Sequence, residues 1–216
     1  MLNQLPAAPT AWWRSPLEMT RLLDALASDA ALPIGIVASG PERLVPALSR
    51  FPSALCVTVQ PWRAPDLALL PAVAAFVGVR PAITPLSELL PQSLQTALWF
   101  DPGPSQILAQ VQLVAACLAP NGRLAVVIVS TRMPPAALPV LRLRRALRQA
   151  GLLVAQTTGY LGPVALAWSA RARLAQTANR PDHYDRYHAA MRAAYAERWP
   201  MALLCRTVVV VGTAQC

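Results

Sequence analysis

The sequence predicts an α/β fold, a three-layer sandwich in which helices cover both faces of a mostly parallel sheet. Short apolar runs alternate with longer segments in which apolar residues recur at helical spacing. The short runs lack the polar alternation of a half-exposed strand, so they predict strands buried on both faces, as in parallel sheets. With 216 residues, 55% of them hydrophobic, the chain is long enough for one domain with a substantial core.

The N-terminal part is expected to differ from the rest. Residues 1–30 predict an irregular arm and a capping helix, and residues 31–216 the α/β domain. Ser15 to Glu18 form a capping box with proline at the first helical position, which predicts that a helix begins there. The first ten residues lack the basic start and apolar core of a secretory signal, so no signal peptide is expected.

Strand and helix signals then alternate to the end of the chain. Strands are predicted at residues 34–38, 54–59, 76–79, 96–100, 123–130, 152–158 and 207–212. Helices are predicted at residues 105–118, 136–150, 164–177 and 182–198. Pro46 and Pro71 fall within helical stretches, so the first two crossover helices are expected to be short or kinked. Gly151 is expected to end the helix that precedes it.

The net charge and the hydropathy of the chain indicate which kinds of binding partner to expect. The formal net charge is +9, and all 19 basic residues are arginine. This charge favours an anionic partner, either an acidic protein or lipid headgroups. Nucleic acid is not expected, because no basic stripe carries interleaved aromatic residues. No run approaches the roughly 18–20 apolar residues of a membrane helix. A cytoplasmic location, with peripheral association at a membrane, is therefore expected.

The four cysteines show no metal-binding pattern. Cys56, Cys117, Cys205 and Cys216 have no CxxC spacing and no histidines in register. Three of them lie in apolar segments, where a reduced thiol packs as a small hydrophobic group. Neither a zinc site nor a disulfide is expected.

Two segments carry a family resemblance. Residues 118–124 end a helix, turn on Asn121 and Gly122, and enter the buried run 125–129; residues 147–152 repeat this order around Gly151. Together they resemble the back half of class I S-adenosylmethionine (SAM) methyltransferases, and the resemblance spans residues 30–213. It implies a seven-stranded sheet whose last strand inserts antiparallel beside the sixth. It also implies SAM at the carboxyl ends of the strands, where ligands of such sheets bind.

The loops that would hold SAM depart from the family pattern. That pattern has an acidic residue shortly before a Gly-x-Gly-x-Gly turn, and Gly40 aligns with the middle glycine. On this alignment Ile36 replaces the acid, Ala38 the first glycine and Glu42 the last. Gln60 stands where the family has a ribose-binding carboxylate, and an amide accepts a weaker hydrogen bond. If SAM binds, the contacts are expected at Ala38, Ser39, Gly40 and Gln60.

Candidate catalytic residues lie in two places. Asp101 follows the fourth predicted strand at the ligand edge, where it either contacts substrate or only begins an Asp-Pro-Gly turn. Tyr184 and His188 share one face of the predicted helix 182–198. They are either a general base near a methyl acceptor or the aromatic side of a helix that packs on the sheet.

Candidate docking residues lie elsewhere. The helix before Gly151 carries four arginines, which either dock on an acidic protein or anionic lipid or form a solvated helix face: Arg142, Arg144, Arg145 and Arg148. Trp12 and Trp13 on the N-terminal arm either anchor a partner or fold back over the sheet.

Two functions follow from the resemblance. The first is a methyltransferase-like protein with an eroded SAM site, a non-catalytic or weakly active accessory subunit that docks on a larger complex, membrane-associated complexes included. The alternative is an active SAM-dependent methyltransferase with a small apolar acceptor, because methyl transfer needs mainly positioning and a dry pocket. An NAD-binding Rossmann domain is disfavoured, because Gly35 and Gly40 lack the required spacing and no ribose-binding acid follows.

Overall fold

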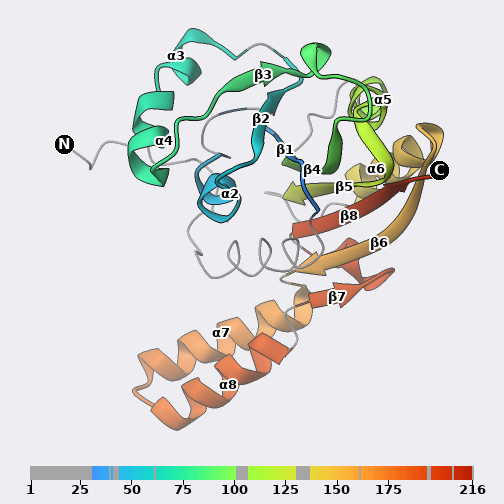
Figure 1. The fold of residues 1–216 in the computed structure, drawn as a ribbon. Coiled ribbons are helices and arrows are strands. Elements are labelled where there is room, and N and C mark those ends of the chain that lie inside the picture. Colours follow the sequence, from blue (N-terminus) through green and yellow to red (C-terminus); the bar gives the residue numbers. More distant parts are fainter. Residues whose placement is uncertain are drawn as a thin grey trace.

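The computed structural model describes residues 31–38, 40, 44–60, 62–100, 107–129, 137–160, 162–193, 196–205 and 207–215. Its eight strands are β1 (Ile34–Val37), β2 (Leu55–Thr58), β3 (Ile83–Pro85), β4 (Leu94–Phe100), β5 (Leu118–Val129), β6 (Leu152–Tyr160), β7 (Ala196–Arg198) and β8 (Thr207–Ala214). They form one sheet in the order β3-β2-β1-β4-β5-β8-β6-β7 (Figure 1).

The direction of the strands matches the prediction. β1 pairs in parallel with β2 and β4, β2 with β3, and β4 with β5. β8 is antiparallel to both of its neighbours, β5 and β6. The predicted mostly parallel sheet with an antiparallel last strand is therefore confirmed, and the three-residue strand β7 is added at its edge.

Helices cover both faces of the sheet. The described helices are α2 (Leu44–Arg50), α3 (Ala64–Leu67), α4 (Leu70–Val77), α5 (Ile107–Ala116), α6 (Ala137–Gln149), α7 (Pro163–Thr177) and α8 (Pro181–Ala193), with 3-10 turns η3 (Leu86–Glu88) and η4 (Met201–Leu204); α2, α4, α5 and α6 pack on the sheet. The crossover helices α2, α3 and α4 are short, as the prolines predict. None of the helices in these described ranges is long and apolar enough to span a membrane.

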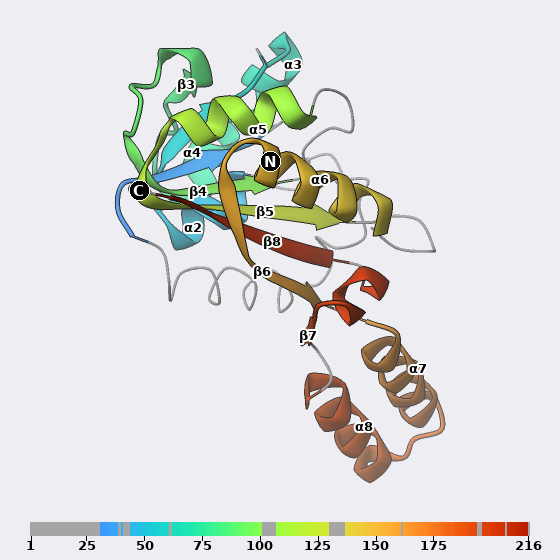
Figure 2. The ribbon, with the colours of Figure 1, turned by 90° about the vertical axis from the view of Figure 1, so that its right-hand side faces the viewer.

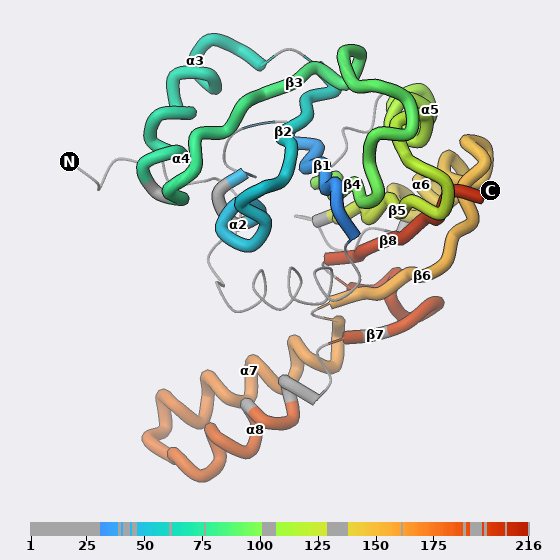
Figure 3. The backbone as a smooth tube through the Cα atoms, in the orientation of Figure 1, coloured from blue at the N-terminus to red at the C-terminus, as the bar shows by residue number. Residues whose placement is uncertain are grey.

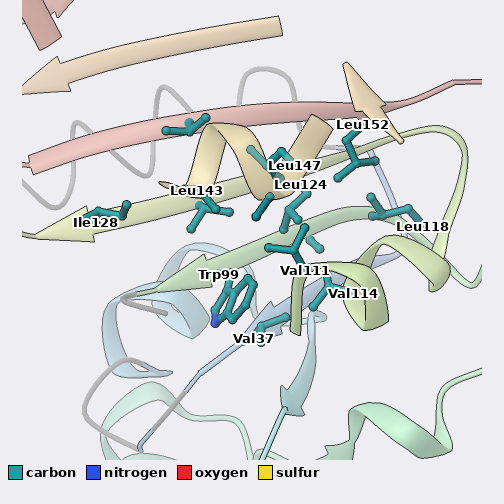
Figure 4. Close-up of a cluster of buried hydrophobic side chains, with 14 of the residues drawn as sticks. Val37, Trp99, Val111, Val114, Leu118, Leu124, Ile128, Leu143, Leu147 and Leu152 are labelled. Carbon is teal, nitrogen blue, oxygen red and sulfur yellow. The ribbon is translucent and has the colours of Figure 1, made fainter. Parts of the chain in front are cut away.

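Alternate residues of the central strands build two separate cores. Trp99 and Val126 belong to the cluster that packs beneath α5 and α6, whose side chains Figure 4 shows. Leu98 and Ala125, their neighbours in sequence, belong to the cluster on the α2 and α4 face. This two-residue alternation places the sheet between two helical layers, so the three-layer architecture is confirmed.

The predicted strand at residues 76–79 is wrong. Phe76 and Val77 end α4, and the third strand is β3, where Thr84 pairs with Val57 of β2. Periodicity does not separate a short buried helix from a strand. The decisive signals are Pro71 in the first helical turn and Gly78, which caps the helix with a φ of 73°.

The predicted turn at Asn121 and Gly122 is a bulge within β5. Leu94 of β4 pairs with Leu118, whereas Thr96 pairs with Arg123, so two steps along β4 face five along β5. Asn121 takes up the extra length with a φ of 61°. Gly122 is packed so closely that a Cβ atom would lie 2.7 Å from the carbonyl oxygen of Ala119. The motif therefore sets the register between β4 and β5.

Helices α7 and α8 form a hairpin that extends away from the sheet (Figures 1 and 2). The tube in Figure 3 follows the chain from β6 through this hairpin to β7 and then to β8. The prediction of one helix over residues 182–198 is wrong at its end, because α8 stops at Ala193 and residues 196–198 pair with β6. Helical periodicity continued there, but the open edge of β6 supplies strand hydrogen bonds instead.

Candidate functional site

The candidate cofactor site lies at the carboxyl ends of β1 and β2. These parallel strands pair with Val37 opposite Val57, and the Ala38 N–H donates to the Val57 carbonyl at 3.1 Å. The sheet therefore brings Ala38 and Gln60 to the same edge. Ala38 and Gly40 are buried and Gln60 is exposed. Ser39 and Glu42 lie outside the described residues.

Trp62 occupies part of this edge, and sequence reasoning missed it. Its indole Nε1 donates a hydrogen bond to the carbonyl oxygen of Ala38 at 3.2 Å, and the side chain is only 9% exposed. Both backbone groups of Ala38 therefore have partners within the protein. The signal in the sequence was a large amphipathic aromatic residue soon after a buried strand, whose N–H needs a partner when buried.

The turn after β2 is held by a hydrogen bond from a side chain to the backbone. Thr58 Oγ1 donates a hydrogen bond to the carbonyl oxygen of Gln60, which fixes the first two residues beyond the strand. Gln60, which the resemblance leads us to expect at the ribose site, is neutral, so a hydrogen bond that it accepts lacks the added strength of a charge. Ile36, which the same alignment sets at the family acid, is fully buried in the core on the α2 face.

The fourth strand ends beside β1, with Trp99 paired to Val37. Trp99 and Phe100 are buried, and β4 ends at the edge that carries Ala38. Asp101, the next residue in the sequence, lies outside the described residues together with residues 102–106. Its role stays a prediction.

The second group of candidate catalytic residues lies on the hairpin. Tyr184 and His188 belong to α8, which packs on α7 in the hairpin that extends away from the sheet (Figure 1). The aromatic partner of α8 is Trp168 of α7, which stacks on Tyr187 with 5.7 Å between ring centroids. The hairpin is attached at β6, four strand positions from β1, or about 19 Å along the sheet at the usual strand spacing. The side chain of His188 is outside the described set.

The described cysteine thiols are part of the core. Cys56, Cys117 and Cys205 are buried, and none of the three is in a disulfide. Burial raises the pKa of the Cys56 thiol to about 11, which disfavours the reactive thiolate. Within the described ranges, no group of three or more His, Cys, Asp or Glu residues is placed to hold a metal ion.

The arginines of α6 divide into two kinds. Arg142, Arg145 and Arg148 are exposed, whereas Arg144 is half-buried. Arg144 Nη1 donates to Thr157 Oγ1 at 2.5 Å, and its guanidinium lies 4.0 Å from the ring centroid of Trp199. Burial, and then the charge of Arg148, lower the pKa of Arg144. Trp12 and Trp13, the other candidate docking residues, lie outside the described residues.

Comparison with known proteins gives a likeness of structure. No family model and no curated protein matches the sequence. A SAM-dependent methyltransferase from Thermotoga maritima has a TM-score of 0.54 at 13% identity, over 92% of this chain and 89% of that one. A geranyl diphosphate C-methyltransferase from Streptomyces coelicolor A3(2), in complex with S-adenosyl-L-homocysteine, has a TM-score of 0.53 at 13% identity, over 90% and 78%.

The same fold also occurs in a protein named for another reaction. The [4+2]-cyclase SpnF has a TM-score of 0.54 at 16% identity, over 90% of this chain and 80% of that one. A shared fold does not assign a reaction, which depends on the site. The strand order, the antiparallel β8 and the two helical layers agree with these structural likenesses. The chain therefore has the fold of the class I SAM-dependent methyltransferases.

Proposed function

We propose that this chain is a methyltransferase-like protein with an eroded SAM site, a non-catalytic or weakly active accessory subunit that docks on a larger complex. The observation that carries the proposal is the hydrogen bond from Trp62 to Ala38. In this bond the protein's own indole occupies the backbone carbonyl of Ala38, the residue that aligns with the first glycine of the cofactor loop. Glycine at such positions lets a ligand approach the backbone closely, and here a side chain of the protein approaches instead.

Two further residues support a weakened site. Ile36 is fully buried among apolar residues, so the position of the family acid has become part of the core. Gln60 is exposed and uncharged at the position of the ribose-binding carboxylate. A charged acceptor makes a hydrogen bond roughly twice as strong as a neutral one, so glutamine in place of a carboxylate weakens the binding of SAM. Isoleucine has no side-chain acceptor, so the bond that the family acid would make is lost.

SAM nevertheless remains the ligand to test, because proteins with this fold were solved with SAM, S-adenosyl-L-homocysteine or sinefungin. On this proposal SAM binds weakly or not at all, and residual binding uses Ala38, Ser39, Gly40 and Gln60. Location in the cytoplasm, with peripheral attachment to a membrane through a partner, belongs to the same proposal.

Calorimetric titration of the purified protein with SAM and S-adenosyl-L-homocysteine tests the proposal. We expect no heat signature of tight binding in either titration. A dissociation constant in the low micromolar range would refute the eroded site, since it requires about −8 kcal/mol of binding free energy. Stable purification within a larger complex, free of cofactor, supports the accessory role.

The second candidate is an active methyltransferase with a small apolar acceptor. It is favoured by the likeness to an enzyme solved with geranyl diphosphate and S-adenosyl-L-homocysteine. In this case SAM binds tightly in the same titration, and Asp101, Tyr184 or His188 contacts the acceptor. Transfer of a radiolabelled methyl group to an organic-soluble product distinguishes this activity from binding alone.

A further inference from the structure

A groove lined by arginines lies between α6 and the residue that follows β7. Its volume is about 480 Å³, and we call it the arginine groove; its lining residues are Leu141, Arg144, Arg145, Arg148, Gln149 and Trp199. This volume is within the range of about 300–1,000 Å³ typical of ligand pockets. No Asp or Glu is among these lining residues, so the three positive charges face the groove without a lining carboxylate.

Arg144 is held in place by two other elements. It donates to Thr157 of β6 at 2.5 Å, and its guanidinium lies over the ring of Trp199 at 4.0 Å. A guanidinium has five N–H donors, so these contacts leave donors of the planar fork for a ligand. Because the side chain is already ordered, binding an anion sacrifices little of its rotamer freedom.

The charges in the groove repel one another. Arg148 follows Arg144 by four residues on α6, which places the two side chains on the same side of the helix. Burial and the charge of Arg148 both lower the pKa of Arg144, which means that its charged form is destabilised. An anion bound between these side chains offsets both effects, since its charge is opposite and it replaces lost water contacts.

The shape of the groove favours a peptide over a membrane. A lipid surface is docked by apolar side chains that project and insert beside the basic ones. Trp199 is 42% exposed, but one face of its ring is engaged by the Arg144 guanidinium and the residue lines the recess, so it is not a free apolar wedge beside the basic side chains. An extended chain can instead place carboxylates within the recess and lay apolar groups against Leu141, which is 45% exposed.

We infer that the arginine groove binds an acidic segment of a protein partner, through Asp or Glu carboxylates held by Arg144, Arg145 and Arg148. The inference rests on the proposed accessory role and names its docking surface and the chemistry of its occupant. The recess lies between α6 and Trp199, apart from the edge that carries Ala38 and Gln60. The groove therefore acts independently of SAM.

A charge-matched pair of variants tests the inference. The probe is a short fluorescein-labelled oligoglutamate peptide, and the readout is fluorescence anisotropy with the full-length protein. Arg145→Gln/Arg148→Gln removes two exposed groove arginines, and Arg173→Gln/Arg180→Gln removes two exposed arginines of the hairpin region. Both have the same net charge. We expect the groove variant to bind about tenfold more weakly or worse, and the control to change less than about twofold.

A third variant separates the built groove from its charge. Trp199→Ala keeps every charge but removes the ring beneath Arg144. If the peptide binds in the groove, we expect this variant to bind it more weakly. Diffuse attraction to a basic protein predicts no change in this variant. Far-UV circular dichroism of each variant verifies that the fold is retained.

Several results would overturn the inference. These are equal weakening by the two charge-matched variants, unchanged binding by Trp199→Ala, or no binding of the peptide to the wild type. Binding to phosphatidylserine vesicles without binding to the peptide assigns the groove to lipid and also overturns it. A SAM titration of the same samples tests the eroded site alone, so failure of that proposal is distinguishable from failure of the groove.

Discussion

Replacement of Gly122 by alanine should destabilise the protein strongly, although only one methyl group is added. The methyl group would lie 2.7 Å from the Ala119 carbonyl oxygen and 3.1 Å from that of Leu94. Both neighbours are backbone atoms in the bulge between β4 and β5, so neither can turn aside as a flexible side chain does. The bulge itself must shift.

The size of the effect follows from what that shift disturbs. Overpacking of a well-packed interior costs about 1–3 kcal/mol. Displacing the bulge also weakens the hydrogen bond from the Leu94 N–H to the Cys117 carbonyl, now 2.9 Å long. A hydrogen bond of this kind contributes about 0.5–1.5 kcal/mol. Together these terms predict a loss of about 3 kcal/mol in the free energy of unfolding.

Urea unfolding followed by tryptophan fluorescence and circular dichroism measures this loss. Gly151→Ala is the matched control, because a Cβ there meets no atom within 4 Å and only the φ of 79° opposes it. That backbone penalty is about 1–2 kcal/mol. With a slope of about 2–3 kcal/mol per molar urea, Gly122→Ala should lower the midpoint by about 1 M.

The difference in unfolding free energy between the two variants shows whether the close contact at the bulge matters. If Gly122→Ala costs no more than Gly151→Ala, then the close approach at the bulge does not limit the residue at this position. The bulge would then have no special part in setting the β4–β5 register.

Three further predictions concern other buried contacts. Trp62→Phe should cost about 1–3 kcal/mol in urea unfolding, because it leaves the Ala38 carbonyl without its donor, and a neutral result would argue against that bond. Gly159→Ala should cost about 1–3 kcal/mol and expose the Cys205 thiol to Ellman's reagent, because a Cβ would lie 2.7 Å from Ala202 Cα; unchanged thiol protection would contradict this. The Cys56 thiol, with its pKa raised by burial from 9.0 to about 11, stabilises the fold fully below pH 9 and loses this contribution as the pH rises through about 11. Urea midpoints of wild type and Cys56→Ala measured below pH 9 and near pH 11 should therefore converge or cross, and parallel curves would exclude the effect.

Most of the sheet was predictable because its strands are buried on both faces. The runs at β1, β2, β4, β5 and β8 are apolar without alternation and are mostly covered on both faces. β6 was detected from its apolar start, although Leu153 is 58% exposed. The two strands that the sequence did not predict are short and incompletely buried. β3 is half-buried and only three residues long, and β7 has exposed ends, so neither has a hydrophobic pattern to detect.

The candidate sites depended on contacts between distant residues, which spacing does not reveal. The sequence placed four arginines on one helix, but Thr157 and Trp199, which hold Arg144, come from two later elements. Likewise, Ala38 and Gln60 were expected at one edge from the family pattern. The indole of Trp62 reaches that edge from beyond β2, which no local pattern predicted.

The central position of β8 bears on how the chain emerges from the ribosome. Thr207–Ala214 is the last strand of the described sheet to be made, yet it alone joins β5 to β6. Until it is released, a nascent chain presents two unpaired strand edges, which are prone to pair with other chains. The α7–α8 hairpin, made earlier, packs on itself and postpones the arrival of β8. Ribosome pausing within the hairpin should therefore increase aggregation of this protein more than pausing before β5.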